Sequence, residues 1–321
     1  MNTTRIEWTD TTWNPVTGCT KVSDGCTHCY AETIATRFAG TAAFPRGFTP
    51  TVRRDRFRQP LTWRAARRVF VNSMSDLFHR DVPEADLVEV FAVMAAAERH
   101  TFQVLTKRQG RMRSLLGSVD FINAVQRRAA EHGAPGPVPW PLPNVWLGVS
   151  VETQPWADRR LGVLFATPAA VRFVSAEPLL GPVDLAPWLN RRFFPGLDWV
   201  IVGGESGPGA RPMNPAWARQ LRDQCQQFAV PFLFKQWGQW WPTRIEPDPA
   251  FVGGVKYRTG PGGGWATAAR LPDHPTRSRA GRWDEHTASV RVGKTRAGRD
   301  LDGRTWDQSP PGPQASGSEG A

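Results

Sequence analysis

The chain has 321 residues, of which 40% are apolar, so it is long enough to bury a sizeable core as one large domain with an appendage. No apolar run reaches the ~18 residues of a membrane span, and the N-terminus is too polar for an export signal, so we expect a cytoplasmic protein. The net charge of +11 favours a polyanionic or phosphate-bearing partner, either a nucleic acid or a nucleotide.

Three of the four cysteines, Cys19, Cys26 and Cys29, lie on one loop within eleven residues. Clustered cysteines in a reducing compartment bind metal more often than they form disulfides. A structural zinc site usually takes four protein ligands, and a cubane iron–sulfur cluster takes one ligand per iron. The three thiols therefore predict a metal or cluster site, and in a cubane they would leave one iron open to a substrate or cofactor.

The cysteine loop enters a predicted first helix whose apolar positions are Tyr30, Ile34 and Phe38. A second stretch, residues 53–68, carries seven arginines opposed only by Asp55. We expect this stretch to contact phosphates, with an ordinary solvated surface as the alternative.

Strand-like apolar runs alternate with helical patterns along the next part of the chain, which predicts a parallel β/α architecture. The expected strands are 69–73, 101–105, 145–151, 171–175, 199–203 and 231–234. A helix after the first strand has Asp81 and Glu84 at capping-box spacing and Pro83 in its first turn. Its apolar stripe is Leu87, Val90, Phe91 and Met94.

Two further helices are predicted to begin near Thr153 and near Asn214. Cys225 shares one face of the latter helix with Trp217, Leu221 and Phe228, so we expect it in the core rather than at the metal site.

Polar residues end each of the six expected strands: Ser73, Ser75 and Asp76; Thr106 and Lys107; Ser150 and Glu152; Ser175 and Glu177; Gly204 and Glu205; Lys235 and Gln236. In β/α barrels and in open parallel sheets, ligands bind at the carboxyl ends of the strands. A single such tip is explained equally well as a helix cap or a structural ion pair. Six in succession favour a closed or nearly closed ring.

The strand–helix alternation stops near residue 241, so residues 1–241 are the predicted barrel. Residues 242–307 are predicted to be an irregular basic extension, and the Pro/Gly/Ser-rich residues 308–321 a disordered tail. Within the extension, Gly293-Lys294-Thr295 lacks the first glycine of a phosphate loop and is a weak phosphate signal.

Around its cysteines the chain resembles radical S-adenosylmethionine enzymes, whose usual motif is Cys, three residues, Cys, two residues, Cys. The spacing from Cys26 to Cys29 matches, whereas six residues separate Cys19 from Cys26. Residues 8–15, the three-cysteine loop and residues 293–304 resemble more closely an uncharacterised phage and bacterial family known for this three-Cys motif. The resemblance covers most of residues 1–307. That family is similar to radical S-adenosylmethionine proteins, with spore photoproduct lyase among its distant look-alikes.

The resemblance implies an α/β fold with a partial (β/α)6-type, TIM-like barrel that binds a [4Fe-4S] cluster and S-adenosylmethionine. Cys19, Cys26 and Cys29 would ligate three irons, and the amino and carboxylate groups of the cofactor would chelate the fourth. Reduction would release a 5′-deoxyadenosyl radical that abstracts a hydrogen atom from the substrate, so an electron donor is an expected partner.

The residues expected to bind the cofactor or substrate follow the strands: Ser73, Ser75, Asp76, Lys107, Ser150, Glu152, Glu177 and Lys235. The first three occupy the place of the Gly-Gly-Glu motif with which radical S-adenosylmethionine enzymes hold the cofactor amino group. The resemblance assigns Lys107 and Lys235 to the cofactor carboxylate or a substrate phosphate. It assigns Ser150, Glu152 and Glu177 to the hydroxyl and ammonium groups of the cofactor.

Two alternatives stay open. One is a non-catalytic zinc- or cluster-stabilised nucleic-acid-binding protein of phage origin, which would need a fourth protein ligand that is not obvious in the sequence. The other is a metal-dependent hydrolase of barrel type, which usually supplies His and carboxylate ligands. The six histidines form neither a His-x-His nor a His-Glu-x-x-His pattern, which argues against the hydrolase.

Overall fold

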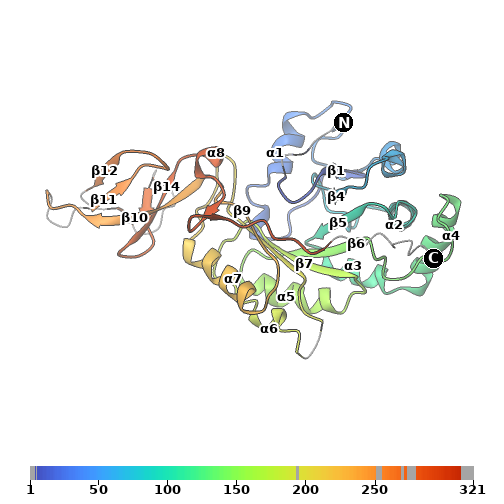
Figure 1. The fold of residues 1–321 in the computed structure, drawn as a ribbon. Coiled ribbons are helices and arrows are strands. Elements are labelled where there is room, and N and C mark those ends of the chain that lie inside the picture. The colour runs from blue at the N-terminus through green and yellow to red at the C-terminus, as the bar shows by residue number, and fades with distance from the viewer. Residues whose placement is uncertain are drawn as a thin grey trace.

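The computed structural model describes residues 4, 6–192, 195–250, 255–268, 271–272 and 280–311. Its main body is a seven-stranded parallel sheet that curls into a half-barrel, with the strand order β1-β4-β5-β6-β7-β8-β9 (Figure 1). The strands are β1 (Thr11–Trp13), β4 (Arg68–Val71), β5 (Thr101–Thr106), β6 (Val145–Ser150), β7 (Val171–Ala176), β8 (Trp199–Gly203) and β9 (Phe232–Gln236).

The predicted α/β class and parallel sheet are confirmed, and the six expected strands occur within two residues of their predicted bounds. A seventh strand, β1, escaped prediction because three residues are too few to show a period. It pairs in parallel with β4 and places the three-cysteine loop directly after the first edge of the sheet. In the described part of the chain β1 and β9 are the two edges, so the ring is a half-barrel rather than closed.

Helices cover the outer face of the sheet (Figure 1). They are α2 (Glu84–Ala96), α3 (Gln109–Leu116), α4 (Val119–Glu131), α5 (Gln154–Phe165), α6 (Ala186–Leu189) and α7 (Pro215–Gln227). All four predicted stripe residues of α2 are buried, and Cys225 is buried in the core beneath α7. The N-cap of α2 is Pro83, so Asp81 and Glu84 do not form the expected capping box.

The inner face of the half-barrel changes in character along the strands. Alternate residues of the strands form an aromatic cluster inside the sheet, capped by Trp8: Phe70, Trp146, Phe173, Trp199, Ile201 and Leu233. Further along the same inner side, toward the carboxyl ends, stand Ser150 and Lys235. The apolar part of the inner face stabilises the curled sheet. The polar part, at the carboxyl ends of the strands, is available for a binding site.

The sequence predicted an irregular extension over residues 242–307, and this prediction is wrong. The segment contributes to a five-stranded antiparallel sheet of order β12-β11-β10-β14-β13. Its strands are β10 (Trp240–Pro247), β11 (Val255–Arg258), β12 (Trp265–Ala268), β13 (Ala280–Arg282) and β14 (Thr287–Arg291). The predicted boundary at residue 241 falls inside β10. Pro242 lies inside this strand and Pro247 ends it, and a proline within a run of residues argues against a strand when only the sequence is considered.

The Gly-punctuated basic segment after β14 has structural partners. It contains α8 (Lys294–Ala297), β15 (Asp300–Leu301) and β16 (Arg304–Thr305). Asp302 accepts hydrogen bonds from Arg219 and Arg222 of α7, and the Trp306 carbonyl accepts one from the Phe234 amide of β9 at 3.0 Å. The segment therefore covers the free edge of the half-barrel, which an exposed edge strand requires.

The disordered tail was predicted to begin at residue 308, and this boundary is too early. The Gln308 amide still donates a hydrogen bond to the Phe232 carbonyl of β9. Residues 312–321 lie outside the described residues. Among the described helices none is both long and apolar enough to cross a membrane.

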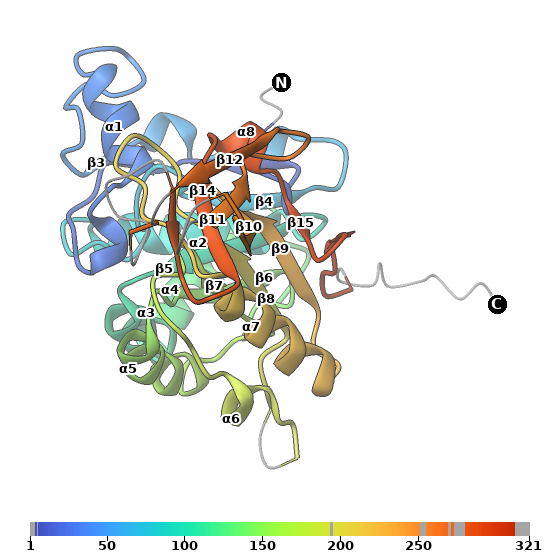
Figure 2. The ribbon, with the colours of Figure 1, turned by 90° about the vertical axis from the view of Figure 1, so that its left-hand side faces the viewer.

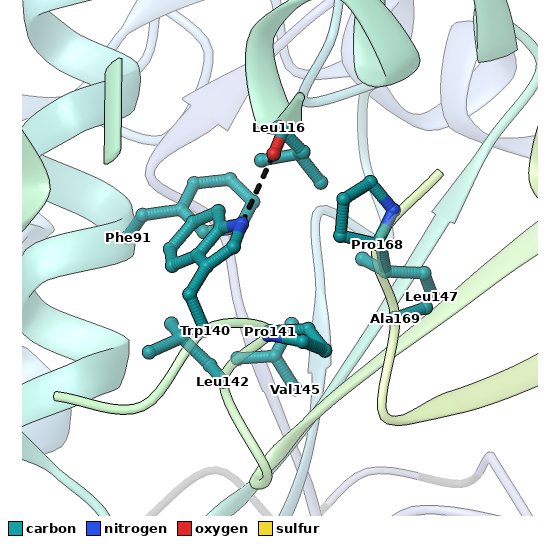
Figure 3. Close-up of a pocket in the computed structure, with 9 residues that line it drawn as sticks. All are labelled: Phe91, Leu116, Trp140, Pro141, Leu142, Val145, Leu147, Pro168 and Ala169. Carbon is teal, nitrogen blue, oxygen red and sulfur yellow. Dashed lines mark hydrogen bonds between the residues drawn. The ribbon is translucent and has the colours of Figure 1, made fainter. Parts of the chain in front are cut away.

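A small apolar cavity lies between α2, the residues before β6 and the α5–β7 loop (Figure 3). Trp140 closes it and donates from its indole nitrogen to the Leu116 carbonyl at 3.0 Å. Its volume of about 10 Å³ leaves room for little more than a water molecule, so it is a packing defect rather than a ligand site.

We expect opposite stability effects from the same substitution at two glycines. A Cβ atom on Gly148 of β6 would lie 2.5 Å from the Phe173 ring inside the half-barrel, so Gly148→Ala should destabilise the fold by about 1–3 kcal/mol. Gly162 lies within α5, and its nearest neighbour would be Trp188 at 3.9 Å, so Gly162→Ala should stabilise by up to about 1 kcal/mol. Urea unfolding of both variants measures the difference; equal effects would show that the inner face is loosely packed.

Candidate functional site

The three-cysteine loop is tied to the carboxyl ends of β1 and β4. It leaves β1 through β2 (Val16–Thr17), which pairs with β3 (Thr51–Val52), and it ends at α1 (Tyr30–Arg37). The Gly18 amide donates to the Met74 carbonyl at 3.0 Å. Gly18 has φ +79°, and a Cβ atom there would lie 2.4 Å from the Thr49 carbonyl oxygen. Only glycine fits this position, so the path of the loop is fixed at its start.

Cys19 sits beside a buried ion pair. An Arg108 guanidinium nitrogen lies 3.4 Å from the Cys19 sulfur and 3.2 Å from an Asp76 carboxylate oxygen. Burial, and then the negative charge of Asp76, raise the pKa of the Cys19 thiol to about 11, although Arg108 acts in the opposite direction. Arg108 also donates to the Thr20 carbonyl at 3.0 Å, so one side chain holds this end of the loop against the β5 tip.

Asp76 holds together the segment after β4 and the segment after β5. Its carboxylate accepts hydrogen bonds from the Thr106 hydroxyl at 2.7 Å and from the backbone amides of Phe78 and Lys107 at 3.0 and 2.9 Å, besides the one from Arg108. Four protein donors occupy the two oxygens. Asp76 therefore acts as a positioning residue here, rather than as the free carboxylate that the sequence analysis expected to hold a cofactor amine.

The two serines beside Asp76 differ. The Ser73 hydroxyl lies 3.3 Å from the side-chain oxygen of Asn14, and its carbonyl accepts a bond from the Tyr30 hydroxyl. The Ser75 hydroxyl oxygen is buried and has no hydrogen-bond partner among the described residues. A buried, unpartnered hydroxyl carries a desolvation penalty that a bound polar group would relieve.

Glu152 is the centre of the site. Its side chain is fully buried and accepts from Lys107 at 2.6 Å, from Arg160 of α5 at 2.8 Å and from the Ser23 hydroxyl at 2.7 Å. Burial alone would raise its pKa, but the charges of Lys107 and Arg160 outweigh burial and hold the pKa of Glu152 below its usual value. A Cβ atom on Gly25 would lie 2.5 Å from the Glu152 side chain, so the middle of the loop rests directly on this carboxylate.

A second charged pair lies further along the curled sheet. Lys235 of β9 lies 2.9 Å from the Glu177 carboxylate after β7, and Gln236 donates to the same carboxylate at 3.1 Å. A Cβ atom on Gly203 would come within 3.2 Å of Glu177, so the glycine makes room for this side chain. The pair places one positive and one negative group at the mouth of the half-barrel.

The loop after β8 also contacts the cysteine loop. Glu205 and Arg211 form an ion pair at 2.6 Å, and Arg211 also donates to the Asp24 carbonyl at 2.9 Å. A Cβ atom on Gly209 would lie 2.5 Å from the His28 ring. The cysteine loop is therefore anchored by β4 and β5 at one end, by Glu152 in the middle and by the β8 loop beyond it.

The thiols are not assembled around one point. Within the described ranges, no group of three or more His, Cys, Asp and Glu side chains is placed to hold a metal ion. Burial raises the pKa of the Cys29 thiol, and the charge of the nearby Cys26 adds a smaller effect in the same direction. The Cys26 sulfur lies 3.8 Å from the Ser23 hydroxyl. The donor types suit a metal centre, but the thiols would have to converge on it.

The family model described as "Protein of unknown function (DUF5131)" matches residues 3–310. The chain belongs to this family. Comparisons with curated proteins and with solved structures gave no match. Membership agrees with the uncharacterised family expected from residues 8–15, the cysteine loop and residues 293–304, and it assigns no activity.

The eight residues expected to bind the cofactor or substrate lie at or just after the carboxyl ends of the half-barrel strands, and several of them are joined in pairs, such as Lys107 with Glu152. Arg108, Arg160 and Ser23 were not predicted as site residues, because their roles arise from partners 89, 8 and 129 residues away. The helix after the loop was predicted correctly, but all three of its predicted apolar positions, Tyr30, Ile34 and Phe38, are exposed.

Removing the charge of Glu152 should destabilise the protein strongly. In Glu152→Gln the buried guanidinium of Arg160 loses its counter-ion, and we expect a loss of about 3–5 kcal/mol in the free energy of unfolding at pH 7. Because the folded pKa of Glu152 is lowered, the loss should be complete above its ordinary value of 4.5 and should shrink as the pH falls below it.

Glu246→Gln is the matched control, because its partner Lys256 and its own side chain are 36% and 47% exposed, and the cost should stay within about 1 kcal/mol. Urea unfolding at several pH values checks both variants. Equal, small losses would mean that Glu152 is not the anchor of the loop.

Proposed function

We propose that this chain is a cytoplasmic radical S-adenosylmethionine-like iron–sulfur protein that acts on a nucleic acid or nucleotide. The observation that supports this proposal most is the position of the three-cysteine loop. It follows the first strand of a parallel half-barrel and is held over the carboxyl ends by Glu152 and Arg108. In β/α folds of this kind, including TIM-like partial barrels, that edge carries the chemistry.

Cys19, Cys26 and Cys29 would hold three irons of a [4Fe-4S] cluster. When bound together, the cluster and S-adenosylmethionine supply a 5′-deoxyadenosyl radical that abstracts a hydrogen atom from a substrate. The reducing electron must come from a separate donor, so an electron-transfer partner belongs to the proposal. The clasp of Ser23 and Gly25 on Glu152 limits how far the loop can move when the thiols converge.

The chain's own residues divide into holding and binding groups. Arg108 and Asp76 fix the position of Cys19 through bonds that leave little capacity for a ligand. Ser75 offers a buried hydroxyl without a partner among the described residues, which suits the cofactor amino group. Lys235 is the positive group at the mouth of the half-barrel and suits a carboxylate or a phosphate.

Ser150 and Glu177 retain their expected assignment to the hydroxyl and ammonium groups of the cofactor, and Ser73 retains its place beside the cofactor amino group. Glu177 already bonds to Lys235 and Gln236, so a ligand there would exchange with existing partners. Lys107 and Glu152 form an ion pair at 2.6 Å, so their charges are already paired within the protein. Of the residues proposed to contact the cofactor, these two contribute most to the structure.

One observation favours the alternative of a non-catalytic metal-stabilised nucleic-acid-binding protein. The described residues contain no preassembled metal group, and a loop whose thiols can move could also close on zinc with a fourth ligand from elsewhere. Metal content separates the two functions, because a zinc protein contains no acid-labile sulfide.

Protein purified without oxygen should be brown and contain about four irons and four sulfides per chain. Changing Cys19, Cys26 or Cys29 to Ala should abolish the stable cluster. Cys225→Ala is the matched control and should keep the full iron content, because Cys225 is buried in the helix-packed core. Stoichiometric zinc without sulfide in anaerobically reconstituted protein would refute the cluster.

Ser75→Ala should keep its iron but bind S-adenosylmethionine about 2- to 10-fold more weakly, the worth of one neutral hydrogen bond. Equilibrium binding to the reconstituted protein measures this change. Ser118→Ala removes a hydroxyl that caps α4 on the outer side and should leave the affinity unchanged. An unaltered affinity in Ser75→Ala would remove Ser75 from the cofactor site.

The reaction has its own readout. Reduced, reconstituted wild type that is supplied with S-adenosylmethionine should release 5′-deoxyadenosine and methionine slowly even without substrate, and Cys26→Ala should release none. If well-reconstituted protein releases none with several reductants and nucleic acids, the enzymatic function is refuted and the binding-protein alternative becomes the better one.

A further inference from the structure

The C-terminal sheet has one apolar and one basic face. Ile245, Ala288 and Val290 point to one side, where they form a small core with Leu271 and Ala280. Residues of the opposite parity point to the other side. On that side lie Arg244 of β10, Lys256 and Arg258 of β11 and Trp265 of β12, and we call these four residues the basic–aromatic face.

Trp265 is unusual among the tryptophans of this chain. All 15 lie in the described residues, and Trp265 alone belongs to the exposed large apolar side chains, with 47% of its surface accessible. In the strand register it stands opposite Arg258. The Arg258 guanidinium and the Lys256 ammonium lie 5.0 and 5.1 Å from its ring centroid. The cations orient the ring on the surface without burying it.

Among the described residues, one carboxylate pairs with a cation of this face. It is Glu246, which lies 3.1 Å from Lys256 and is itself 47% exposed. Arg244 is exposed, and Arg258 donates to the Gly263 carbonyl at 2.9 Å, which holds it in place without cancelling its charge. An exposed ring beside several cations matches the two requirements of a nucleic-acid surface, which are a platform for a base and positive groups for phosphates.

The chemistry favours single strands over duplexes. A duplex offers its phosphates to cations, but its bases are stacked inside and cannot reach a tryptophan on a sheet surface. A single strand presents both phosphates and the faces of its bases. A protein partner would require a wider apolar patch than one aromatic ring flanked by cations.

The basic–aromatic face leads to the carboxyl edge of the half-barrel. β9 ends at Gln236 and β10 begins at Trp240, so the C-terminal sheet begins close to the carboxyl end of the last half-barrel strand. Figure 2 shows β9 and β10 near each other. Arg291 of β14 donates to the Gly207 carbonyl at 3.3 Å, and Arg211 of the same loop donates to the Asp24 carbonyl of the cysteine loop. These bonds connect the C-terminal sheet to the three-cysteine loop through the loop after β8.

We propose that the basic–aromatic face binds single-stranded nucleic acid, with a base stacked on Trp265 and phosphates bound by Arg244, Lys256 and Arg258. The face guides the bound nucleic-acid strand to the carboxyl edge of the half-barrel, and this second part rests on the proposed function. The proposal narrows the substrate class from a nucleic acid or nucleotide to a single-stranded nucleic acid.

The test is binding of the full chain to fluorescein-labelled oligothymidylate and oligouridylate about 12 nucleotides long, a length within the range of known single-strand sites. Fluorescence anisotropy should show binding of one or both single strands and much weaker binding of the matching duplex. Trp265→Ala should weaken single-strand binding about 5- to 150-fold, and Trp265→Phe should restore part of it, because phenylalanine keeps an aromatic face. Arg258→Gln should lower the slope of log affinity against log salt by about 0.7.

The chain supplies a matched control on another element. Phe38 of the α1 end is 46% exposed, and the Arg37 guanidinium lies 5.6 Å from its ring centroid. Figures 1 and 2 both show α1 apart from β11 and β12. Phe38→Ala and Arg37→Gln should leave affinity and salt slope unchanged. Thermal unfolding confirms that each variant is folded at the assay temperature.

The outcomes separate this inference from the proposed function. Binding should persist in Cys26→Ala, because the basic–aromatic face contains no cysteine. No binding of single strands, equal binding of the duplex, or equal losses in Trp265→Ala and Phe38→Ala would overturn the inference. Single-strand binding that depends on Trp265 in a protein that never releases 5′-deoxyadenosine would support the inference and refute only the radical chemistry.

Discussion

The buried carboxylate of Glu152 is the interaction on which the site depends. It joins a lysine from the β5 tip, an arginine from α5 and a hydroxyl from the cysteine loop, and all three donors lie within 2.8 Å. A buried carboxylate without such partners would be very unfavourable, so the three donors and the position of the loop over Glu152 depend on one another. Gly25 is part of the same constraint, because any larger residue would push the loop away from Glu152.

The half-barrel separates stability from function along its inner face. Aromatic side chains fill the inside near the amino ends, with Trp8 within 4.5 Å of Phe70 between ring centroids. The polar residues lie beyond this apolar cluster, at the carboxyl ends of the strands. The open edge at β9 would invite pairing with another chain, and the segment after β14 prevents this by binding along it.

The late basic segment shows how a charged motif can serve the fold. Its Asp302 binds two arginines of α7, its Leu301 is fully buried, and the indole of Trp237 donates to the Asp300 carbonyl at 2.7 Å. These bonds account for the Leu-Asp-Gly turn without any phosphate. The arginine stretch at residues 53–68 is similar in part, since Arg54 forms a two-point ion pair with Asp86 of α2. Part of each basic stretch therefore stabilises the fold through ion pairs.

The sequence by itself determined the parallel α/β class, six of the seven strands of the half-barrel, the burial of Cys225 and the gathering of polar tips at one edge. These features follow from local periodicity, which burial on both faces of a parallel sheet writes into short apolar runs. Tertiary structure alone decided that Asp76 is saturated by protein donors, that Arg108 and Arg160 complete the site, and that residues after 239 form a second sheet. Each of these depends on partners far apart in the chain, or on strands interrupted by proline, and no local pattern encodes such pairings.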